Sequence, residues 1–413
     1  MQIDSADLLE RFLRYVQIDT RSDDRSPTCP STPGQWDLLR LLQREMADLG
    51  LADVVLTDQG YALGTLPGNS PRPVPTIAWF AHVDTATNLP GAARPIVHRA
   101  YDGRPLVLPD DPTQKLTLET TPFLRDAIGQ DIITASGLTL LGADDKAGIA
   151  TVMAAVRHLL RHPEIKHGPI RVCFNPDEEI ARGMAGLDLA QVGAACGYTL
   201  DGSSPGEIDF ETFSADAAVL EIRGVASHPG WAKDVMVNAA RLAGRFLAAL
   251  PAELSPERTD GRDGFIHPVE CTASAEQAKV RMIVRDFELD GLAAKRALLE
   301  RLAADLRAAA PKATVTLTFT EQYRNMRYWL EQDMRPVAYA QEAVRRAGLV
   351  PKSTAIRGGT DGSNLTQRGL PTPNIFCGMH EVHSQREWVS VPDMAKAVET
   401  LVHLAQVWEE NSP

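Results

Sequence analysis

The sequence has few of the features that mark secreted, membrane or nucleic-acid-binding proteins. Five cysteines among 413 residues lie scattered, without a C-x-x-C pair, which is typical of a reducing compartment. No apolar run approaches the roughly 18 residues needed to span a bilayer, and the acidic, amphipathic start is unlike a basic signal region. The formal net charge of −12 leaves no basic stripe for phosphate groups. We therefore expect a cytoplasmic protein whose partners include neither membrane nor nucleic acid.

The length and the order of predicted elements indicate more than one domain. A chain of 413 residues exceeds what one hydrophobic core usually supports. Residues 209–322 follow a β-α-β-β-α-β pattern, the split βαβ arrangement of a ferredoxin-like domain. Helices and strands alternate before and after this segment. We expect an α/β domain built from residues 1–208 and 323–413, with residues 209–322 inserted into it.

Hydrophobic periodicity places the main elements of the α/β domain. A helix is predicted from Ser5 to Tyr15, and a second begins near Thr32, with an apolar face of Leu38, Leu41, Leu42 and Met46. The segment 89–130 is rich in proline and polar residues and predicts surface hairpins or loops, with no indication of its role. Further predictions are strands at 74–81, 170–174, 194–200 and 374–377 and a helix at 147–160.

Histidine and acidic motifs follow three of these strands directly. His82 follows the first, Asp177-Glu178-Glu179 follows the second, and Asp201 ends the third. In an open α/β sheet, the ligand crevice lies at the carboxyl ends of the strands. Each motif alone has an ordinary structural explanation, such as a capped strand, a charged turn or, for Asp144 and Asp145, the N-cap of a helix. Their coincidence at one sheet edge instead favours a site for divalent cations.

The residue types suit a pair of divalent cations that share one carboxylate. Glu178, beside a ligand glutamate, is then a candidate general base, and Asp84 is placed to accept the second imidazole N–H of His82. Nucleophile-based hydrolysis has no comparable support, because no G-x-S-x-G elbow or catalytic-cysteine signature is present. The candidate ligands are His82 and Asp201 for one cation, Glu179 and His383 for the other, and Asp144 as the bridge.

Several motifs resemble those of the peptidase T family, tripeptide aminopeptidases among the co-catalytic zinc metallopeptidases related to aminoacylases and carboxypeptidases. The resemblance covers nearly the whole chain, and the Asp-Asp-Lys and Asp-Glu-Glu motifs are specific when found in this order. The matching stretches are Thr76–Thr85, Leu141–Gly148, Asn175–Glu179, His228-Pro229-Gly230, Arg285-Asp286-Phe287, Arg357–Gly362 and His383–Glu387.

The resemblance implies a zinc-peptidase domain with a mixed, mostly parallel sheet flanked by helices, and two Zn²⁺ ions on the five ligands above. It also implies that Glu178 is the base and that Asp84 orients His82. His383 is preferred to His380 because the family's His-x-x-x-Glu pattern is satisfied by His383 and Glu387. The preceding segment, residues 379–382, departs from the family's sequence, which leaves the entry to this loop open.

In relatives, the inserted domain is a lid that also forms a dimer contact, and its His-Pro-Gly histidine reaches a partner's active site. The resemblance therefore implies a homodimer and a substrate contact for His228. Arg285 and Arg357 are candidates for binding the substrate carboxylate, because a guanidinium matches a carboxylate bidentately. Without the resemblance, structural ion pairs are the favoured explanation for the two arginines, and a polar loop histidine explains His228 at least as well as a substrate contact.

We expect an aminopeptidase that uses two zinc ions to remove the N-terminal residue from short peptides, most of all tripeptides. A related amide hydrolase, such as a carboxypeptidase, dipeptidase or acyl-amino-acid deacylase, is the nearest alternative. A non-catalytic metal-binding scaffold is a further alternative, which the intact Glu178 argues against. Oxygen-rich sites of this kind also accept Mn²⁺ or Co²⁺.

Overall fold

The computed structural model describes residues 1–412, and the chain folds into two units. The first unit contains Met1–Phe210, Tyr328–Thr354 and the chain from Thr360 onward. The second contains Glu211–Arg327 and Ala355–Gly359. The sequence pattern did not predict that residues 355–359 belong to the second unit. Their place there follows from the parallel pairing of two short strands, β11 (Glu211–Thr212) and β16 (Ala355–Ile356).

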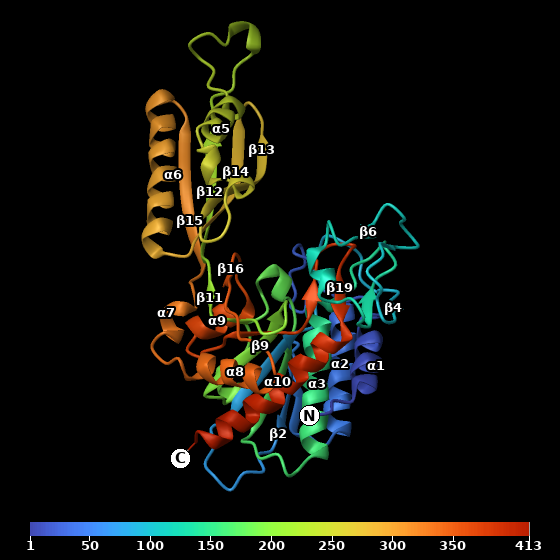
Figure 1. The fold of residues 1–413 in the computed structure, drawn as a ribbon. Helices are drawn as coiled ribbons and strands as arrows, with labels where there is room; N and C mark the ends of the chain where they lie inside the picture. The colour runs from blue at the N-terminus through green and yellow to red at the C-terminus, as the bar shows by residue number, and fades with distance from the viewer. Residues whose placement is uncertain (413) are drawn as a thin grey trace. The chain divides into compact units, whose positions relative to one another are not determined.

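A seven-stranded mixed sheet forms the centre of the first unit (Figure 1). Its strands run in the order β1 (Ala52–Leu56), β2 (Ala62–Leu66), β8 (Ile170–Asn175), β3 (Ile77–His82), β9 (Cys196–Gly202), β17 (Asn374–Phe376) and β10 (Ile208–Asp209). The four strands from β8 to β17 are parallel, and antiparallel pairs lie at both edges. The mixed α/β sheet is thus confirmed, with more antiparallel pairing than the sequence predicted.

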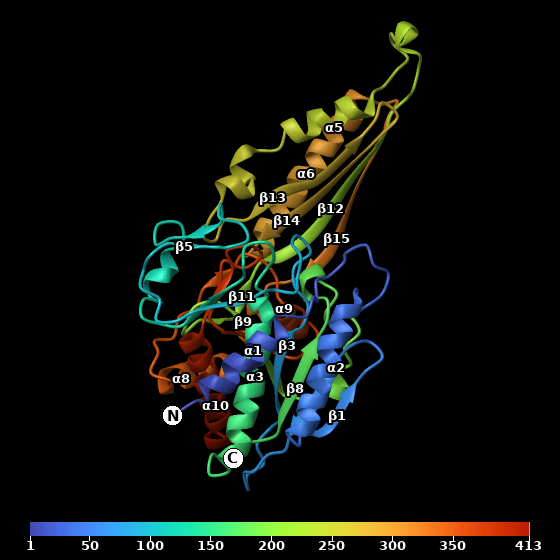
Figure 2. The same ribbon diagram turned by 90° about the vertical axis from the view of Figure 1, so that its right-hand side faces the viewer.

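Helices cover this sheet, as Figure 2 also shows for α2 and α3. All residues of β3 and β8 are buried, as expected of apolar strands covered on both faces. Leu187, Val192 and Leu365 share one core cluster with Phe80 of the sheet. The helices are α1 (Ser5–Tyr15), α2 (Pro33–Asp48), α3 (Ala143–Arg161), α4 (Leu189–Val192), α7 (Arg327–Leu330, at the boundary between the units), α8 (Arg335–Arg346), α9 (Asp361–Gln367) and α10 (Val391–Glu410).

The apolar face of α2 differs slightly from its prediction. Leu38, Leu42 and Met46 are buried as expected, but Leu39 is fully buried in place of Leu41, which is half-buried. The helix packs against β1, β2 and β8. The position of these strands, rather than the periodicity of the helix alone, selects which leucine is covered.

The segment 89–130 contributes to a separate small core of the first unit. Tyr101, Leu108 and Leu124 pack there against Trp388. The surrounding elements are short, as the proline-rich sequence predicted. They are the 3₁₀ helix Pro122–Arg125, the hairpin β5 (Leu106–Val107) and β6 (Lys115–Leu116), and the sheet β18 (Met379–His380), β19 (Trp388–Ser390), β7 (Ile132–Thr134) and β4 (Ile96–His98).

The second unit is a four-stranded antiparallel sheet with two helices on one face. Its strand order is β13 (Phe265–Ala273), β14 (Gln277–Asp286), β12 (Ser214–Arg223), β15 (Thr314–Tyr323). The first strand lies between the third and the fourth, as the split βαβ pattern requires. The helices α5 (Ala239–Ala248) and α6 (Leu289–Ala309) contribute Phe246 and Leu299 to the core of this unit.

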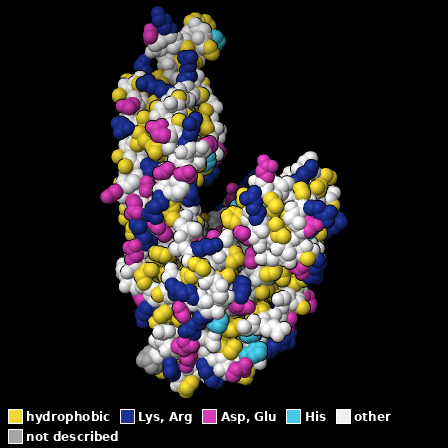
Figure 3. Space-filling model, in the orientation of Figure 1, with side chains coloured by type: hydrophobic (Ala, Val, Ile, Leu, Met, Phe, Trp, Pro, Cys, Tyr) yellow, Lys and Arg dark blue, Asp and Glu magenta, His cyan; other side chains and the backbone are white. Residues whose placement is uncertain are grey.

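On the face drawn in Figure 3, basic and acidic side chains are interspersed and no basic stripe is visible. Within residues 1–412, none of the helices combines the length and the apolar character needed to cross a membrane.

Candidate metal centre

Three adjacent parallel strands bring the predicted motifs to one edge of the large sheet. His82 is the last residue of β3, and Asp201 is the penultimate residue of β9. Strand β8 ends at Asn175 and leads into the loop that carries Glu178 and Glu179. Because β8, β3 and β9 are neighbours in this order, their carboxyl ends lie side by side. These residues therefore lie at the sheet edge where the sequence predicted them.

The start of α3 separates the roles of two neighbouring aspartates. Asp144 and Asp145 both have non-helical backbone angles. The Asp145 carboxylate accepts hydrogen bonds from the backbone N–H of Gly148 (3.1 Å) and of His82 (3.2 Å). It therefore caps the helix, as the simple structural explanation proposed. Asp144 has no such capping contact and turns its carboxylate toward two imidazoles.

The Asp144 carboxylate lies between His82 and His383. Its Oδ1 is 2.9 Å from His82 Nε2, and its Oδ2 is 3.2 Å from His383 Nε2. Glu179 Oε1 lies 3.0 Å from the same nitrogen of His383, and Asp201 Oδ1 lies 4.0 Å from His82 Nε2. Two groups of three donors result, each with its ligand atoms within 4.8 Å of one another and with Asp144 in both: His82, Asp144 and Asp201, and Asp144, Glu179 and His383.

The chemistry of this donor set fits divalent cations. Burial raises the pKa values of Glu179 and Asp201, and the charge of Asp144 raises them further. Within residues 1–412, neither carboxylate has a lysine or arginine as an ion-pair partner. Convergent carboxylates without a cationic partner repel one another, and a dication bound between them removes that repulsion. Imidazole nitrogens and carboxylate oxygens are also the ligands that zinc accepts.

Asp84 contacts one residue of each group of donors, Glu179 and His82, without belonging to either group. It is fully buried, and its carboxylate accepts the backbone N–H groups of Glu178 (3.0 Å) and Glu179 (3.1 Å). His82 Nδ1 lies 3.1 Å from the main-chain carbonyl of Asp84 and 3.4 Å from its carboxylate. The sequence predicted that the Asp84 carboxylate accepts the second imidazole N–H of His82. In the structure, the main-chain carbonyl of Asp84 lies near the same nitrogen as well. Either acceptor fixes the tautomer that leaves Nε2 facing the other donors.

Glu178 is half-buried at this site. Burial raises its pKa well above the usual value for a glutamate, with a further contribution from the charge of Asp361. Glu178 belongs to neither group of donors. Its position beside Glu179 agrees with the separate function that the sequence suggested, and that function stays a prediction.

Glu387 holds the backbone on which Asp144 sits. Its two carboxylate oxygens accept the N–H groups of Gly142 (2.8 Å) and Asp144 (3.0 Å). Its side chain is buried, and burial raises its pKa to about 7. Sequence reasoning used Glu387 only to choose between two histidines. Its spacing from His383 was a signal, but it did not show which backbone groups the carboxylate would reach.

Asp177 anchors the loop of Glu178 and Glu179 to α2. It has a left-handed backbone (φ 55°) and is fully buried. Its Oδ1 accepts a hydrogen bond from Gln35 Nε2 (2.7 Å), and its N–H donates to Gln35 Oε1 (3.2 Å). Sequence reasoning gave Asp177 no role, because its partner is 142 positions away in the chain.

His383, not His380, faces the other candidate ligands. His380 is buried and stacks on Phe123 and on Trp388, with ring centroids 5.2 and 4.3 Å apart. Burial lowers its pKa to about 4. His383 keeps 48% of its side chain exposed and contacts Asp144 and Glu179. The choice that rested on the His-x-x-x-Glu spacing matches this geometry.

The three candidate substrate-binding residues lie in the second unit. His228 is exposed and caps the 3₁₀ helix Pro229–Trp231, next to Trp231, which is 76% exposed. Arg285 is buried, donates to main-chain carbonyls and lies over the ring of Tyr323. Arg357 donates to the carbonyls of residues 259, 261 and 263. Both arginines thus have structural partners, and their substrate role stays a prediction.

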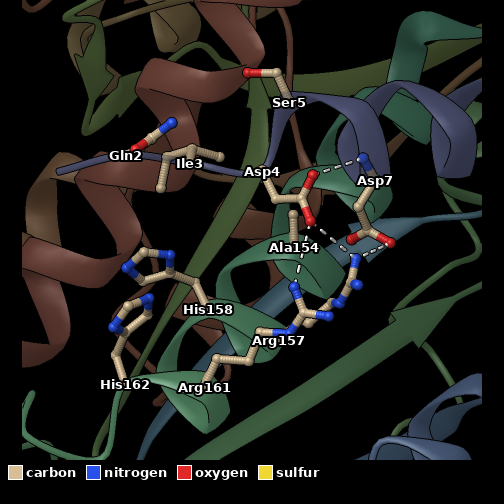
Figure 4. A pocket seen from close by; sticks show the side chains of 10 residues that line it. All are labelled: Gln2, Ile3, Asp4, Ser5, Asp7, Ala154, Arg157, His158, Arg161 and His162. Carbon is tan, nitrogen blue, oxygen red and sulfur yellow. Dashed lines mark hydrogen bonds and ion pairs between the residues drawn. The ribbon is translucent and has the colours of Figure 1, made fainter.

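A well-formed cavity elsewhere in the first unit carries none of the candidate ligands. It has a volume of about 400 Å³ and lies between the start of α1 and the end of α3 (Figure 4). Its basic groups are neutralised, because Arg157 pairs with Asp4 and Asp7 and Arg161 pairs with Asp4. This cavity is therefore no part of the candidate metal centre.

Comparison with known proteins places the chain in one family. Residues 140–407 match the family model described as peptidase family M20/M25/M40. The structure is similar to that of the aminopeptidase PepT from Bacillus cereus ATCC 10987, with a TM-score of 0.76, 22% identity and coverage of 98% of this chain and 99% of that one. It is also similar to a tripeptidase from Staphylococcus aureus, with a TM-score of 0.75, 19% identity and full coverage of both chains. At these identities, the two structures establish the fold alone.

The chain belongs to the peptidase family M20/M25/M40, a family of hydrolytic enzymes. Within it, the chain is 44% identical to Peptidase T of Geobacillus thermodenitrificans strain NG80-2, over 98% of this chain and 99% of the relative. The resemblance to the peptidase T family, which the sequence motifs indicated, is thereby confirmed.

Proposed function

We propose that the protein is an aminopeptidase that removes the N-terminal residue from tripeptides and uses two divalent cations, most simply Zn²⁺. The observation that carries this proposal is the pair of donor groups that share Asp144. His82 and Asp201 would hold one cation, and Glu179 and His383 the other. Family membership and 44% identity to a Peptidase T support the reaction type and the peptide substrate.

The side chains around the donors have distinct tasks in this proposal. The bound cations would supply Lewis-acid chemistry, which polarises the scissile carbonyl and makes water acidic enough to attack at neutral pH. Glu178 takes a proton from the attacking water on its carboxylate and delivers it to the leaving nitrogen. Asp84 holds the backbone of Glu178 and the ring of His82 through the contacts described above. Glu387 fixes the position of Asp144.

The inserted unit completes the proposal. By resemblance, it forms a homodimer contact, and His228 contacts the substrate of the partner subunit. Arg285 and Arg357 would bind the substrate carboxylate after exchanging their present main-chain partners. The reducing compartment that the scattered cysteines favour is the cytoplasm.

A panel of blocked and unblocked peptides tests the function. Metal-defined enzyme is given trialanine, N-acetyl-trialanine, trialanine amide, dialanine and tetraalanine, and the released products are identified. Cleavage of free alanine from the amino end, fastest for trialanine and absent for the acetylated peptide, is the expected result. Release of acetate from the acetylated peptide would show a deacylase, and release of alanine from the acetylated peptide but not from trialanine amide would show a carboxypeptidase. Metal binding without hydrolysis of any peptide would leave only the scaffold alternative.

A further inference from the structure

A further buried carboxylate lies at the sheet edge that carries the candidate ligands. Asp361 begins α9 and is only 5% exposed. Its Oδ2 accepts a hydrogen bond of 2.6 Å from the side-chain amide of Asn175. Asn175 ends β8, pairs in register with His82 on β3, and precedes Glu178 by three positions. Asp361 is therefore attached to the part of the sheet edge that carries the base.

The other oxygen of Asp361 is left without a protein partner. Within residues 1–412, the hydrogen bond from Asn175 is the only one to this carboxylate, and no lysine, arginine or histidine forms an ion pair with it. Gly183 packs close to Oδ1, since a Cβ atom there would lie 3.1 Å from it, and the glycine contributes no side chain that could bond to this oxygen. A buried carboxylate with a free oxygen is costly unless a cation or another donor satisfies it.

Asp361 shares the sheet edge of the candidate ligands, because Asn175, which donates to it, is paired in register with His82. Asp361 belongs to neither group of donors. The edge therefore carries a buried carboxylate that neither cation would use. A positively charged group of the substrate would offset its charge.

We propose that Asp361 binds the α-ammonium group of the peptide substrate. The inference rests on the proposed aminopeptidase function and adds the residue that selects a free amino terminus. In an N-terminal residue, only Cα separates the ammonium nitrogen from the scissile carbonyl carbon, so these atoms are about 2.5 Å apart. A receptor for the ammonium group must therefore lie close to the groups that act on that carbonyl, and Asp361 is held at their sheet edge by Asn175, the residue paired with His82. Its free Oδ1 accepts one of the three ammonium N–H groups, and a charge-assisted hydrogen bond results.

The test compares Asp361→Asn with the wild-type enzyme on two matched substrates. One is trialanine, and the other is propionyl-dialanine, which lacks only the α-amino group. For trialanine, kcat/KM should fall on the order of 10²-fold in the variant, because one partner of a buried charge pair has been removed. For propionyl-dialanine, the low wild-type rate should not change. Asp209→Asn is the matched control, because Asp209 is another buried aspartate of the first unit and lies outside the site.

The outcomes separate recognition from structure. A positioning role for Asp361 behind Asn175 would lower both rates by the same factor and leave the preference for the free amine intact, which overturns the inference. A wild-type enzyme that prefers N-acetyl-trialanine overturns the proposed function, and the inference with it. A wild-type preference for trialanine that persists in Asp361→Asn overturns the inference alone.

A second measurement serves if Asp361→Asn does not fold. Glu178→Gln, loaded with metal and crystallised with trialanine, should show the peptide nitrogen within about 3 Å of Asp361 Oδ1, the usual length of such a bond. A nitrogen bound at any other group would exclude Asp361 as the receptor.

Discussion

At the scale of single residues, the Asp144 carboxylate belongs to both groups of donors, and each of its oxygens faces a different imidazole. Replacing it with alanine should lower metal content below two ions per chain and abolish peptide hydrolysis, because two adjacent dications would lose the carboxylate that offsets their repulsion. Elemental analysis of protein loaded under defined metal conditions measures this stoichiometry. Two metal ions per chain in Asp144→Ala would contradict the bridging role.

Glu178 should behave differently, because it belongs to neither group of donors. Glu178→Gln keeps the size of the side chain and removes its capacity to carry a proton. The loss of a general base typically costs about 10²- to 10⁴-fold in rate, so kcat should fall by this factor while both metal ions stay bound. Steady-state kinetics and metal analysis of one preparation check both statements. Near wild-type turnover would show that another group is the base.

The buried carboxylate of Glu387 makes a more specific prediction. In the wild type, the two oxygens of Glu387 accept the N–H groups of Gly142 and Asp144. In Glu387→Gln, the amide oxygen can accept only one of these N–H groups, and the amide nitrogen, itself a donor, then faces the other. Support of this kind for a metal ligand is worth about 10- to 100-fold in metal affinity. Competition with a chelator should therefore show weaker metal binding, whereas excess metal should restore most of kcat. Unchanged affinity would mean that Glu387 supports the fold and not Asp144.

At the scale of secondary structure, Asp209 in β10 makes stability depend on pH. It is buried, accepts hydrogen bonds from the N–H (2.7 Å) and the hydroxyl (3.0 Å) of Thr354, and burial raises its pKa to about 6. The folded protein thus holds this proton more tightly than the unfolded chain, so stability decreases as the pH rises from about 4 to about 6 and stays lower above that range.

Asp209→Asn removes this pH dependence, because the amide oxygen keeps the role of acceptor and cannot ionise. The free energy of unfolding of the variant at pH 7.5 should exceed that of the wild type by up to about 3 kcal/mol, the equivalent of roughly two pKa units. The difference should shrink toward zero at pH 4. Urea unfolding of both proteins at each pH measures it. A difference that does not vary with pH would exclude titration of Asp209 as its cause.

Elements with a strong local pattern were predictable from the sequence, and contacts between distant segments were not. The helix from Ser5 to Tyr15 has the predicted bounds, because its N-cap and its buried apolar face are both local signals. Strand order was not local, yet the motifs at the strand ends indicated the correct sheet edge. The hydrogen bonds of Asp177 with Gln35 and of Glu387 with the start of α3 join segments that only the folded chain brings together. No periodicity in the sequence encodes such pairs.

At the scale of the whole molecule, dependence of activity on assembly is testable. His228 is exposed beside the exposed ring of Trp231, as a residue that contacts another molecule would be. His228→Ala should remove most turnover without changing metal content, since the loss of one donor to a developing oxyanion costs roughly 10²- to 10³-fold in rate.

Mixing His228→Ala with Glu178→Gln gives heterodimers in which one site combines an intact base with the partner's intact histidine. Activity should recover in the mixture if His228 acts across the dimer. Native mass spectrometry of differently tagged chains provides the control that subunits have exchanged. Exchange without recovered activity would place the action of His228 within its own chain.

The five proposed ligands occur at positions 82, 144, 179, 201 and 383, with the whole inserted unit between the last two. During synthesis, a chain that has emerged only as far as residue 210 carries His82, Asp144 and Asp201 but lacks His383. The second group of donors is then incomplete, and Glu387, which fixes Asp144, has not yet been made. On the proposed ligand set, the order of residues along the chain would delay proteolytic competence: the protein would be inert while nascent and would acquire activity only when its carboxyl-terminal segment joins the sheet that its amino-terminal half began.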